Sequence, residues 1–307
     1  MRPLLGIILT AACLGAADPT FRHSVTLVSV PVSVFDRKTH AAIPDLRITD
    51  FVLADNGQPR DIVDLDADAA PLDLVLLLDV SGTMRAALAS VADRAADALG
   101  VLGREDRAAV MCFGKRAQVT EELTGDFDEA ASGVRRAFAA QVGLDTDINQ
   151  AVWAAADYLH RNGGPGRRRA ILIMTDNMQV SPVADSLVEE QLFEADATLD
   201  GLLVRGRIPV PHLTHSGVLR FAAATGGETI ESPQASARLG QMIEHIKKRY
   251  VLHFRPAVRN STAARRISVH LTGEAKRKHP HAVVRARGSY LPAPVYRPKH
   301  EFSGKIA

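Results

Sequence analysis

The sequence predicts an α/β protein in which helices cover a doubly wound, mostly parallel sheet and the two ends of the chain form a second, small β domain. Two observations predict this fold. In the middle of the chain, fully apolar runs alternate with amphipathic helical segments, an order typical of a parallel sheet. On either side, short segments alternate apolar and polar residues, as half-buried antiparallel strands do.

The first 17 residues are typical of a signal peptide. Met1 and Arg2 give a positive start, Leu4–Leu14 is apolar, and Gly15–Ala17 supplies the small residues that precede a cleavage site. We therefore expect cleavage near Ala17 and export, so that the protein is secreted, periplasmic or part of the cell envelope. The apolar run is too short to span a bilayer, and no later segment predicts a transmembrane helix.

The two cysteines favour no disulfide. Cys13 follows Thr10, Ala11 and Ala12, which resembles a bacterial lipoprotein cleavage box, but leucine is usual in place of Thr10. A lipid anchor at Cys13 is therefore the less favoured alternative to plain cleavage. Cys112 lies in an apolar run and is interpreted as a small core residue.

Residues 20–66 form the N-terminal β segment. Val30, Val32 and Val34 alternate with other residues, as expected of a strand with one buried face. Asp55-Asn56-Gly57 predicts a hairpin turn between strands at 51–54 and 62–65, because Asn-Gly tolerates positive φ. These strands alone bury too little apolar surface, so they must pair with another part of the chain.

Residues 72–250 form the predicted α/β domain. Leu74–Leu78 is a continuous apolar run, as expected of a central strand covered on both faces. Further buried strands are predicted at 108–113, 170–174 and 199–204. Apolar stripes at helical spacing predict helices that contain residues 88–102, 148–159, 217–224 and 239–250.

Residues 251–290 return to a β pattern, and 291–307 are predicted to be a tail. Ile267, Val269 and Leu271 alternate with polar residues. We expect these strands to join residues 20–66 in one sheet or sandwich. The composition, with 46% hydrophobic and 23% charged residues, is ordinary for a globular protein. The net charge of +2 gives no general attraction for nucleic acid, and the basic runs at 167–169 and from Lys276 onward are interpreted as solvated loops.

Oxygen-bearing side chains follow two of the predicted strands. Asp79, Ser81 and Thr83 come directly after the first apolar run, and Asp176 follows the run at 170–174. Thr146 precedes the helix that begins near residue 148. Ligands of open α/β sheets gather at the carboxyl ends of the strands, so we expect these five residues to converge there.

Two carboxylates and three hydroxyls suit a hard cation. Mg²⁺ prefers oxygen ligands with only one or two carboxylates, and Mn²⁺ and Ca²⁺ are alternatives. The set contains no histidine or thiol, which disfavours zinc and copper. We expect Gly82 to let the backbone turn sharply, so that Asp79, Ser81 and Thr83 point into one place.

These residues resemble the metal-ion-dependent adhesion site of von Willebrand factor type A (VWA) domains, whose fold is Rossmann-like. Asp79-x-Ser81-x-Thr83, Thr146 and Asp176 match its pattern and strand context. The resemblance implies that the hydroxyl groups bind the metal directly and that the acids often do so through water. It also implies a sixth position, which a protein partner completes with an Asp or Glu.

The resemblance extends over most of the mature chain, from about Thr20 to Tyr290, to a bacterial secreted VWFA-related family without a defined biochemical role. It is carried outside the site by Thr20-Phe21-Arg22, Asp50-Phe51, Asp55-Asn56-Gly57 and the ending 284–290. Together these likenesses imply an exported adhesion or assembly module, with neither catalysis nor nucleic-acid binding.

Two positions depart from the VWA pattern, and both keep the ligand set. Thr83 stands where serine is commoner, and Asn177 replaces the glycine that usually follows the last acid. Asp145 and Asp147 flank Thr146 and are interpreted as loop solvation or helix capping. We place Gly82, Asp145 and Asn177 on the rim where a ligand would dock.

Two other functions stay open. A strand that ends in Asp-x-x-x-Thr, with a later Thr-Asp, is similar to haloacid dehalogenase-like phosphatases, in which Asp79 would be the nucleophile. That chemistry needs a second acid two residues later, where Ser81 stands. In the other alternative the chain is a structural scaffold, its β segments bind the partner, and the metal only makes the loops rigid.

Overall fold

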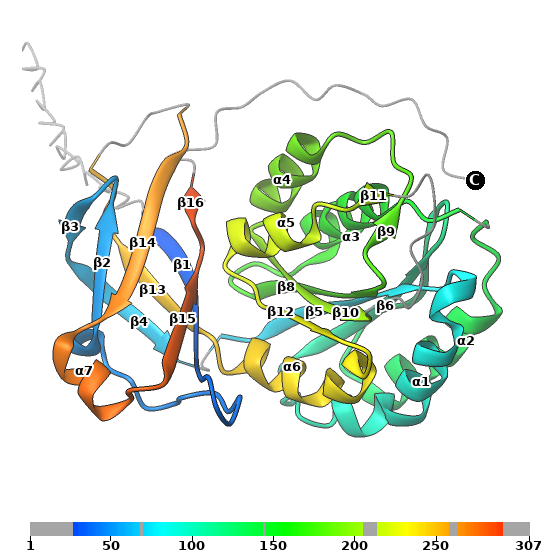
Figure 1. Cartoon of the computed structure of the whole chain (residues 1–307), viewed down its shortest axis with the longest axis horizontal. Helices are drawn as coiled ribbons and strands as arrows, with labels where there is room; N and C mark the ends of the chain where they lie inside the picture. Colours follow the sequence, from blue (N-terminus) through cyan, green and yellow to red (C-terminus); the bar gives the residue numbers. More distant parts are fainter. Residues whose placement is uncertain (1–26, 68–69, 144, 205–213, 258–262, 291–307) are drawn as a thin grey trace, which may run out of the picture.

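The computed structural model describes residues 27–67, 70–143, 145–204, 214–257 and 263–290, and it has two parts that lie side by side (Figure 1). The α/β part is built on a six-stranded sheet in the order β12-β10-β8-β5-β6-β7, in which only the pairing of β6 with β7 is antiparallel. Its strands are β5 (Leu72–Asp79), β6 (Arg107–Phe113), β7 (Ala117–Thr124), β8 (Arg168–Thr175), β10 (Ala197–Val204) and β12 (Thr229–Ser232).

The apolar runs become the centre of this sheet because helices cover both of its faces. Every residue of β5 is buried; Leu74, Leu76 and Leu78 face one layer of helices, and Val75 and Leu77 face the other. The first layer holds α1 (Arg85–Leu99), α2 (Phe127–Ala139) and α6 (Leu239–Lys247). The second holds α3 (Ile148–Asn162), α4 (Asp185–Glu194) and α5 (Val218–Thr225). The predicted doubly wound, mostly parallel fold is confirmed.

Several short elements occur along the chain. Three are 3₁₀ turns, η1 (Ile48–Asp50), η2 (Gly82–Met84) and η3 (Ala235–Arg238). Two more strands, β9 (Met178–Gln179) and β11 (Thr214–His215), pair antiparallel beside the carboxyl ends of the main strands.

The other part is a β-sandwich made from both ends of the chain. One sheet has the order β15-β1-β13-β4 and the other β16-β14-β2-β3, and their inner faces share one apolar core. The first sheet joins chain ends that are far apart in sequence, because β1 pairs with both β13 and β15. The elements are β1 (Val28–Asp36), β2 (Phe51–Asp55), β3 (Gln58–Arg60), β4 (Ile62–Ala67), β13 (Tyr250–Phe254), β14 (Arg265–Leu271), α7 (Gly273–Lys278), β15 (Ala282–Ala286) and β16 (Ser289–Tyr290).

The Asn-Gly turn is present, but its predicted partner strand is wrong. Asn56 and Gly57 have φ values of 49° and 79°, as a tight hairpin turn requires. The strand that returns from this turn is β3, whereas β4 crosses to the other sheet and pairs with β13. The apolar pattern missed β3 because it consists of Gln58, Pro59 and Arg60, and a proline is tolerated on this edge strand.

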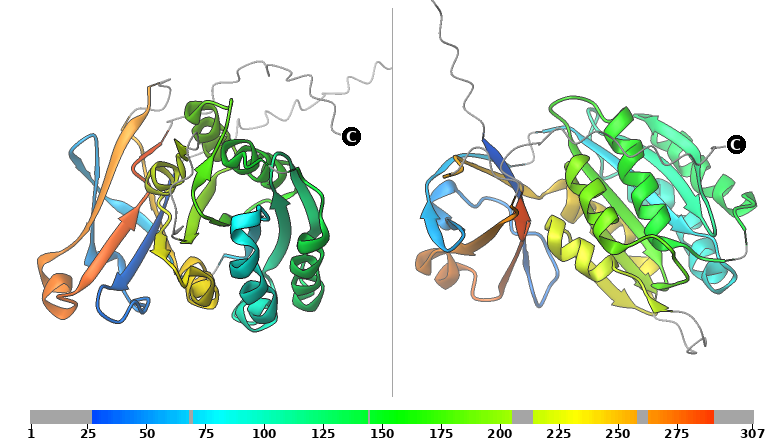
Figure 2. Two further views of the ribbon diagram at one scale, coloured as in Figure 1. Left: turned by 45° about the vertical axis from the view of Figure 1, so that its right-hand side comes forward. Right: turned by 90° about the horizontal axis from the view of Figure 1, so that it is seen from above.

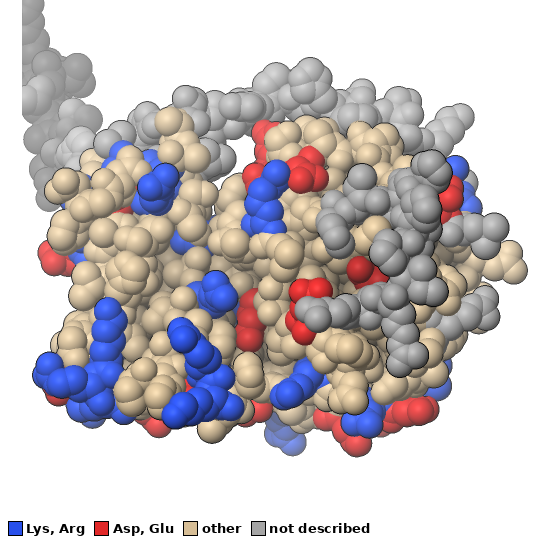
Figure 3. All heavy atoms as spheres, viewed as in Figure 1, with Lys and Arg blue, Asp and Glu red and all other residues tan. Residues whose placement is uncertain are grey.

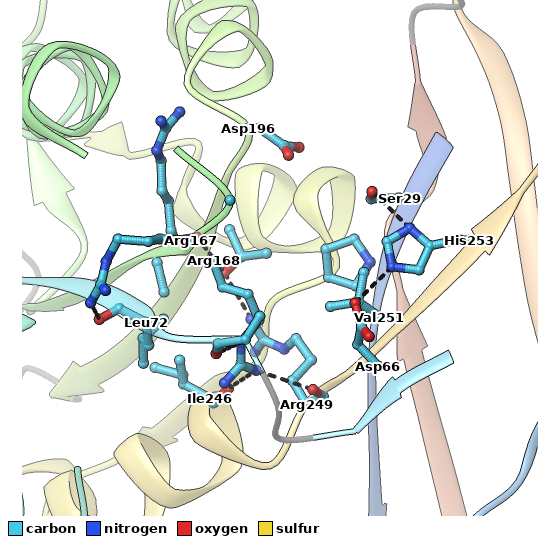
Figure 4. Close-up of a pocket in the computed structure, with 16 residues that line it drawn as sticks. Ser29, Asp66, Leu72, Arg167, Arg168, Asp196, Ile246, Arg249, Val251 and His253 are labelled. Carbon is cyan, nitrogen blue, oxygen red and sulfur yellow. Dashed lines mark hydrogen bonds and ion pairs between the residues drawn. The ribbon is translucent and has the colours of Figure 1, made fainter. Parts of the chain in front are cut away.

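The run Arg167–Arg169 is not a solvated loop, which corrects the prediction. It leads into β8 at the seam between the two parts, beside a cavity of about 310 Å³ (Figure 4). Arg167 donates to the buried Asp73 at 2.6 Å, and Arg168 donates to the carbonyls of Ile246, Lys247 and Arg249, at the end of α6 and just beyond it. A guanidinium that binds several carbonyls in this way fixes the exit of α6 toward β13.

The two parts lie side by side in both views of Figure 2, and further bonds across the seam hold them together. Arg249, which is 3% exposed, donates to Asp200 of β10 at 2.6 Å and to Ser33 of β1 at 2.7 Å. Arg287 donates to Asp196 at 3.0 Å. A buried charge needs such partners, so these contacts fix the orientation of the β-sandwich at the amino ends of the parallel strands.

Several predictions made for the chain ends lie outside the described residues. These are the signal peptide at 1–17, the lipid anchor at Cys13, the first residues of the 20–66 segment and the tail at 291–307. Within the described residues, no helix is both long and apolar enough to cross a membrane. The chain from Lys276 onward was expected to be a solvated loop, and instead it forms the end of α7 and then β15.

Candidate metal centre

The two acids of the predicted site lie at the same edge of the sheet. Asp79 is the last residue of β5, and Asp176 directly follows the last residue of β8. These strands are parallel neighbours, with Leu78 opposite Met174, so their carboxyl ends meet. The seam lies at the other end of these strands, because the cavity at the seam is lined by residues from the beginnings of β5, β8 and β10. The two acids therefore lie at the end of the strands that is away from the seam.

Hydrogen bonds bring four of the five predicted residues together. The hydroxyl of Thr83 donates to a carboxylate oxygen of Asp176 at 2.7 Å. The hydroxyl oxygens of Ser81 and Thr83 are 3.1 Å apart, and the backbone amide of Ser81 donates to Asp79 at 3.0 Å. The loop after β5 therefore reaches the loop after β8 through side-chain oxygens.

Asp79 is fully buried, and its second oxygen accepts a hydrogen bond from the hydroxyl of Thr175 at 2.7 Å. Burial raises the pKa of Asp79 to about 6, and the charge of Asp176 adds to this rise, whereas the bonds from Thr175 and Ser81 oppose it. The sequence did not single out Thr175 as a site residue. Its only signal was its position as the last residue of the strand before Asp176.

Thr146 reaches this edge through its backbone. Its carbonyl accepts from the amide of Val180, just after β9, and the next amide, that of Asp147, donates to Gly114 beyond β6. The side chain of Thr146 is half-buried. Within the described residues, no hydrogen bond links its hydroxyl to the other four residues.

A pair of amide side chains fixes the loop after Asp176, and sequence reasoning missed both. Asn149 and Gln179 are joined by two hydrogen bonds, each 3.0 Å long. The backbone amide of Asn149 donates to the side-chain carbonyl of Gln179, and the side-chain amide of Gln179 donates to the side-chain carbonyl of Asn149. Both residues are buried, so the pair ties β9 firmly to the start of α3. Such reciprocal pairing has no signature in sequence spacing.

Asn177 keeps the backbone shape that a glycine would give. Its φ is 64°, in the left-handed region that asparagine tolerates better than most residues. Its side-chain carbonyl accepts from the hydroxyl of Ser216, and its backbone carbonyl accepts from the Ser216 amide at 3.1 Å. The departure from glycine therefore leaves the loop fixed.

The structure corrects the reason given for Gly82. This residue lies in η2, its φ is not positive, and a methyl group added there would contact no atom within 4 Å. The turn therefore needs no glycine, although Gly82 is exposed beside Ser81 and Thr83. Asp147 caps α3 by accepting from the Gln150 amide at 3.0 Å, as predicted, and Asp145 is largely exposed opposite Lys115.

The donor chemistry of this edge fits a hard divalent cation. The described residues contain no group of three or more His, Cys, Asp or Glu side chains that could hold a metal, so any ion here would depend on hydroxyls as well. Asp79, Ser81, Thr83 and Asp176 supply two carboxylates and two hydroxyls through the hydrogen bonds above. Burial, and to a smaller extent the charge of Asp176, disfavours the ionised form of Asp79, and a bound cation would stabilise that form.

Comparisons with known proteins found similar solved structures and one matching family model. The structure is similar to an aerotolerance-related membrane protein from Bacteroides fragilis (TM-score 0.44, 16% identity, covering 58% of this chain and 99% of that one). It is also similar to BatB from Bacteroides thetaiotaomicron (TM-score 0.41, 19% identity, 57% and 99%). A von Willebrand factor type A protein from Catenulispora acidiphila is similar as well (TM-score 0.48, 12% identity, 89% and 74%). No curated protein matches. Residues 74–179, which include all five predicted ligands, match the family model of the von Willebrand factor type A domain, and this part of the chain is a VWA domain.

Proposed function

We propose that the protein is an exported, non-catalytic binding module that captures an acidic residue of a protein partner at a divalent metal site. Asp79, Ser81, Thr83, Thr146 and Asp176 would hold the ion, with Mg²⁺ favoured by the all-oxygen donor set. VWA domains mediate protein–protein interactions, and this supports a binding role. Export rests on the residues of the first 17 positions.

The observation that carries the proposal is the bond from Thr83 to Asp176. It joins two loops that are 93 residues apart in sequence, at the edge where Asp79 ends β5. Asp79 is buried, whereas Thr83 is exposed and Asp176 is half-buried. The site is therefore anchored on its inner side and open on its outer side, which an incoming carboxylate requires.

The residues around the ion have separable tasks. Thr175 and the Ser81 amide orient the Asp79 carboxylate, and the Asn149–Gln179 pair holds the loop that carries Asp176. A bound cation would supply the positive charge that attracts a partner's Asp or Glu. The chain itself supplies a preformed set of oxygens, so little reorganisation is needed when a partner binds.

The direct test is titration of the mature protein with Mg²⁺, followed by capture of partners from envelope and secreted fractions with and without a chelator. We expect Asp176→Ala and Thr83→Ala to weaken Mg²⁺ binding and to abolish chelator-sensitive capture. Asp97→Ala, which removes an exposed carboxylate from α1, is the matched control and should change neither. Mg²⁺ binding that is equal in all variants would refute the site.

The two alternatives predict different results. A phosphatase would hydrolyse a phosphate ester and lose this activity in Asp79→Asn, but Ser81, in the place of the needed second acid, lies within hydrogen-bond distance of Thr83 and has no acidic proton to give. A structural scaffold would lose thermal stability in the chelator while it kept its partner. Chelator-sensitive capture without turnover supports the binding module alone.

A further inference from the structure

A cluster of cations lies at one end of the β-sandwich, outside the VWA domain. Its members are Arg37 and Lys38, which follow β1, Lys276 and Arg277 of α7, and Arg285 of β15. We call these five residues the basic end. We propose that the basic end docks on the anionic phospholipid headgroups of a bilayer surface.

The turn after β1 presents Arg37 and Lys38 without neutralising them. The carboxylate of Asp36 accepts from the backbone amides of Lys38 and Thr39, at 2.7 and 2.9 Å. These two bonds stabilise the ionised carboxylate, so they lower the pKa of Asp36. The carboxylate thus binds the backbone instead of the neighbouring cations. Both basic side chains remain exposed.

Hydrogen bonds fix α7 and β15 at the same end. Thr272 caps α7 by accepting from the Ala275 amide, and its own amide donates to the carbonyl of Asp50. The turn after α7 then leads into β15, and the amide of Arg37 donates to the carbonyl of His281 in this turn at 2.9 Å. The cations of the basic end are therefore held on one rigid framework.

The basic end carries unbalanced charge. None of its five residues forms an ion pair within the described part of the chain; the adjacent Lys278 pairs with Glu274 at 3.0 Å. Asp45, Asp50 and Glu274 lie at the same end, where they line a groove together with Lys278. Over residues 36–50 and 273–285, seven Lys or Arg side chains face four acids, which leaves a charge of +3. The whole chain carries +2, so the remaining residues sum to −1. Figure 3 shows Lys and Arg side chains gathered over the lower part of the β-sandwich.

A bilayer surface fits this feature better than a nucleic acid does. Residues 36–42 and 273–287 contain no Phe, Tyr or Trp, so the basic end offers no platform on which unpaired bases could stack. Headgroup phosphates attract clustered Lys and Arg without a groove or a defined spacing. The candidate metal centre lies at the edge of the VWA sheet away from the β-sandwich, so docking through the basic end would leave it accessible to a partner.

The test is cosedimentation of the mature protein with phosphatidylcholine vesicles that either contain or lack phosphatidylglycerol. We expect binding only to the anionic vesicles, and we expect it to weaken as salt shortens the range of the attraction. The variant Lys38→Gln/Lys276→Gln/Arg277→Gln should bind about 100-fold more weakly, since each cation near a charged surface contributes severalfold to affinity. A chelator should leave vesicle binding unchanged, which separates this result from a failure of the metal site.

A matched control decides whether position or total charge matters. Arg94→Gln/Arg104→Gln/Arg135→Gln removes three exposed VWA cations that also lack ion pairs in the described structure. This variant should bind vesicles like the unchanged protein, and both triple variants should keep their thermal stability. Equal binding to the two kinds of vesicle, or equal loss in both variants, would overturn the proposal. Retention on an acidic polysaccharide without vesicle binding would overturn it as well.

Discussion

The imidazole of His245, in α6, lies between one acceptor in its own part of the molecule and one across the seam. Its Nδ1 lies 2.8 Å from a carboxylate oxygen of Glu228 in the α/β part, and its Nε2 lies 2.7 Å from the backbone carbonyl of His40 in the β-sandwich. Both partners are acceptors at these distances, so both ring nitrogens must carry a proton for both bonds to form. The ring is buried and stacks on Phe35 of β1, with the ring centroids 5.7 Å apart. The contact of Nε2 with the His40 carbonyl links the two parts of the molecule, and protonation of the ring allows both bonds to form together.

The first prediction concerns the pH dependence of this link. Burial lowers the pKa of His245, but the hydrogen bond and charge of Glu228, the carbonyl of His40 and the charge of Glu244 outweigh it and raise the pKa. A raised folded-state pKa gives stability that is fully present below the unfolded value, about 6.5, and is lost as pH rises through the folded value. We expect His245→Gln to lower the free energy of unfolding by about 2 kcal/mol at pH 6 and by less at alkaline pH.

Urea denaturation at a series of pH values measures this difference. His281→Gln, in the exposed turn before β15, is the control and should leave the pH profile almost unchanged. A His245 ring that carries a single proton at pH 6, as judged by its nitrogen chemical shifts, would contradict the assignment.

The second prediction concerns the buried ion pair of the same seam. Arg249 and Asp200 are 3% and 0% exposed, so removing one charge leaves the other without compensation. We expect Asp200→Asn to lower the free energy of unfolding by about 3–5 kcal/mol, whereas Arg249→Met/Asp200→Leu recovers much of this loss. The exposed pair of Lys278 and Glu274 is the comparison, and Glu274→Gln should cost less than about 0.5 kcal/mol. A double variant as unstable as the single one would show that the hydrogen bonds to Ser33 and Thr198 matter more than the pair.

The third prediction links Asp79 to the metal. When a chelator has removed the metal, Asp79 stays protonated in the folded state up to about pH 6. In the unfolded state it loses its proton near the ordinary pKa of an aspartate. For an acid with a raised pKa, stability falls as pH rises between these two values, here by on the order of 3 kcal/mol. We expect this fall in the wild type and not in Asp79→Asn, and we expect Mg²⁺ to reverse it only in the wild type. Thermal unfolding between pH 4 and 7.5 measures it, and a flat wild-type profile would refute it.

Sequence patterns predicted the strands that position the candidate site better than they predicted its surroundings. Asp79 and Asp176 could be placed because each follows a long apolar run, and a fully buried strand must end where polar residues begin. The amphipathic helix α2 and the edge strand β7 were missed, since β7 mixes apolar and charged residues without a buried run. The Asn149–Gln179 pair could not be predicted, because it depends on how β9 meets α3 in space.

The β-sandwich shows the same limit. Asn56-Gly57 identified a turn from the conformations these residues tolerate, but turn chemistry does not determine how long the returning strand is. Arg249 and His245 were unremarkable in the sequence because a buried charge is recognised only by its partners, which are far away along the chain. Local patterns thus predicted both parts of the fold, whereas the seam between them required the three-dimensional structure.

The last prediction compares two glycines that share a backbone conformation and differ in their surroundings. Gly57 and Gly226 have φ values of 79° and 85°. A Cβ added to Gly57 would meet no atom within 4 Å, so Gly57→Ala should cost only the conformational strain of about 1 kcal/mol. A Cβ added to Gly226, at the end of α5, would lie 2.5 Å from the backbone nitrogen of Arg287, on the β-sandwich side of the seam. Backbone cannot move aside cheaply, so Gly226→Ala should cost about 3 kcal/mol or more and should weaken the bond between Arg287 and Asp196. Equal free energies of unfolding for the two variants would mean that the backbone near Arg287 can move away from α5 at little cost. The β-sandwich would then not be fixed against the VWA domain.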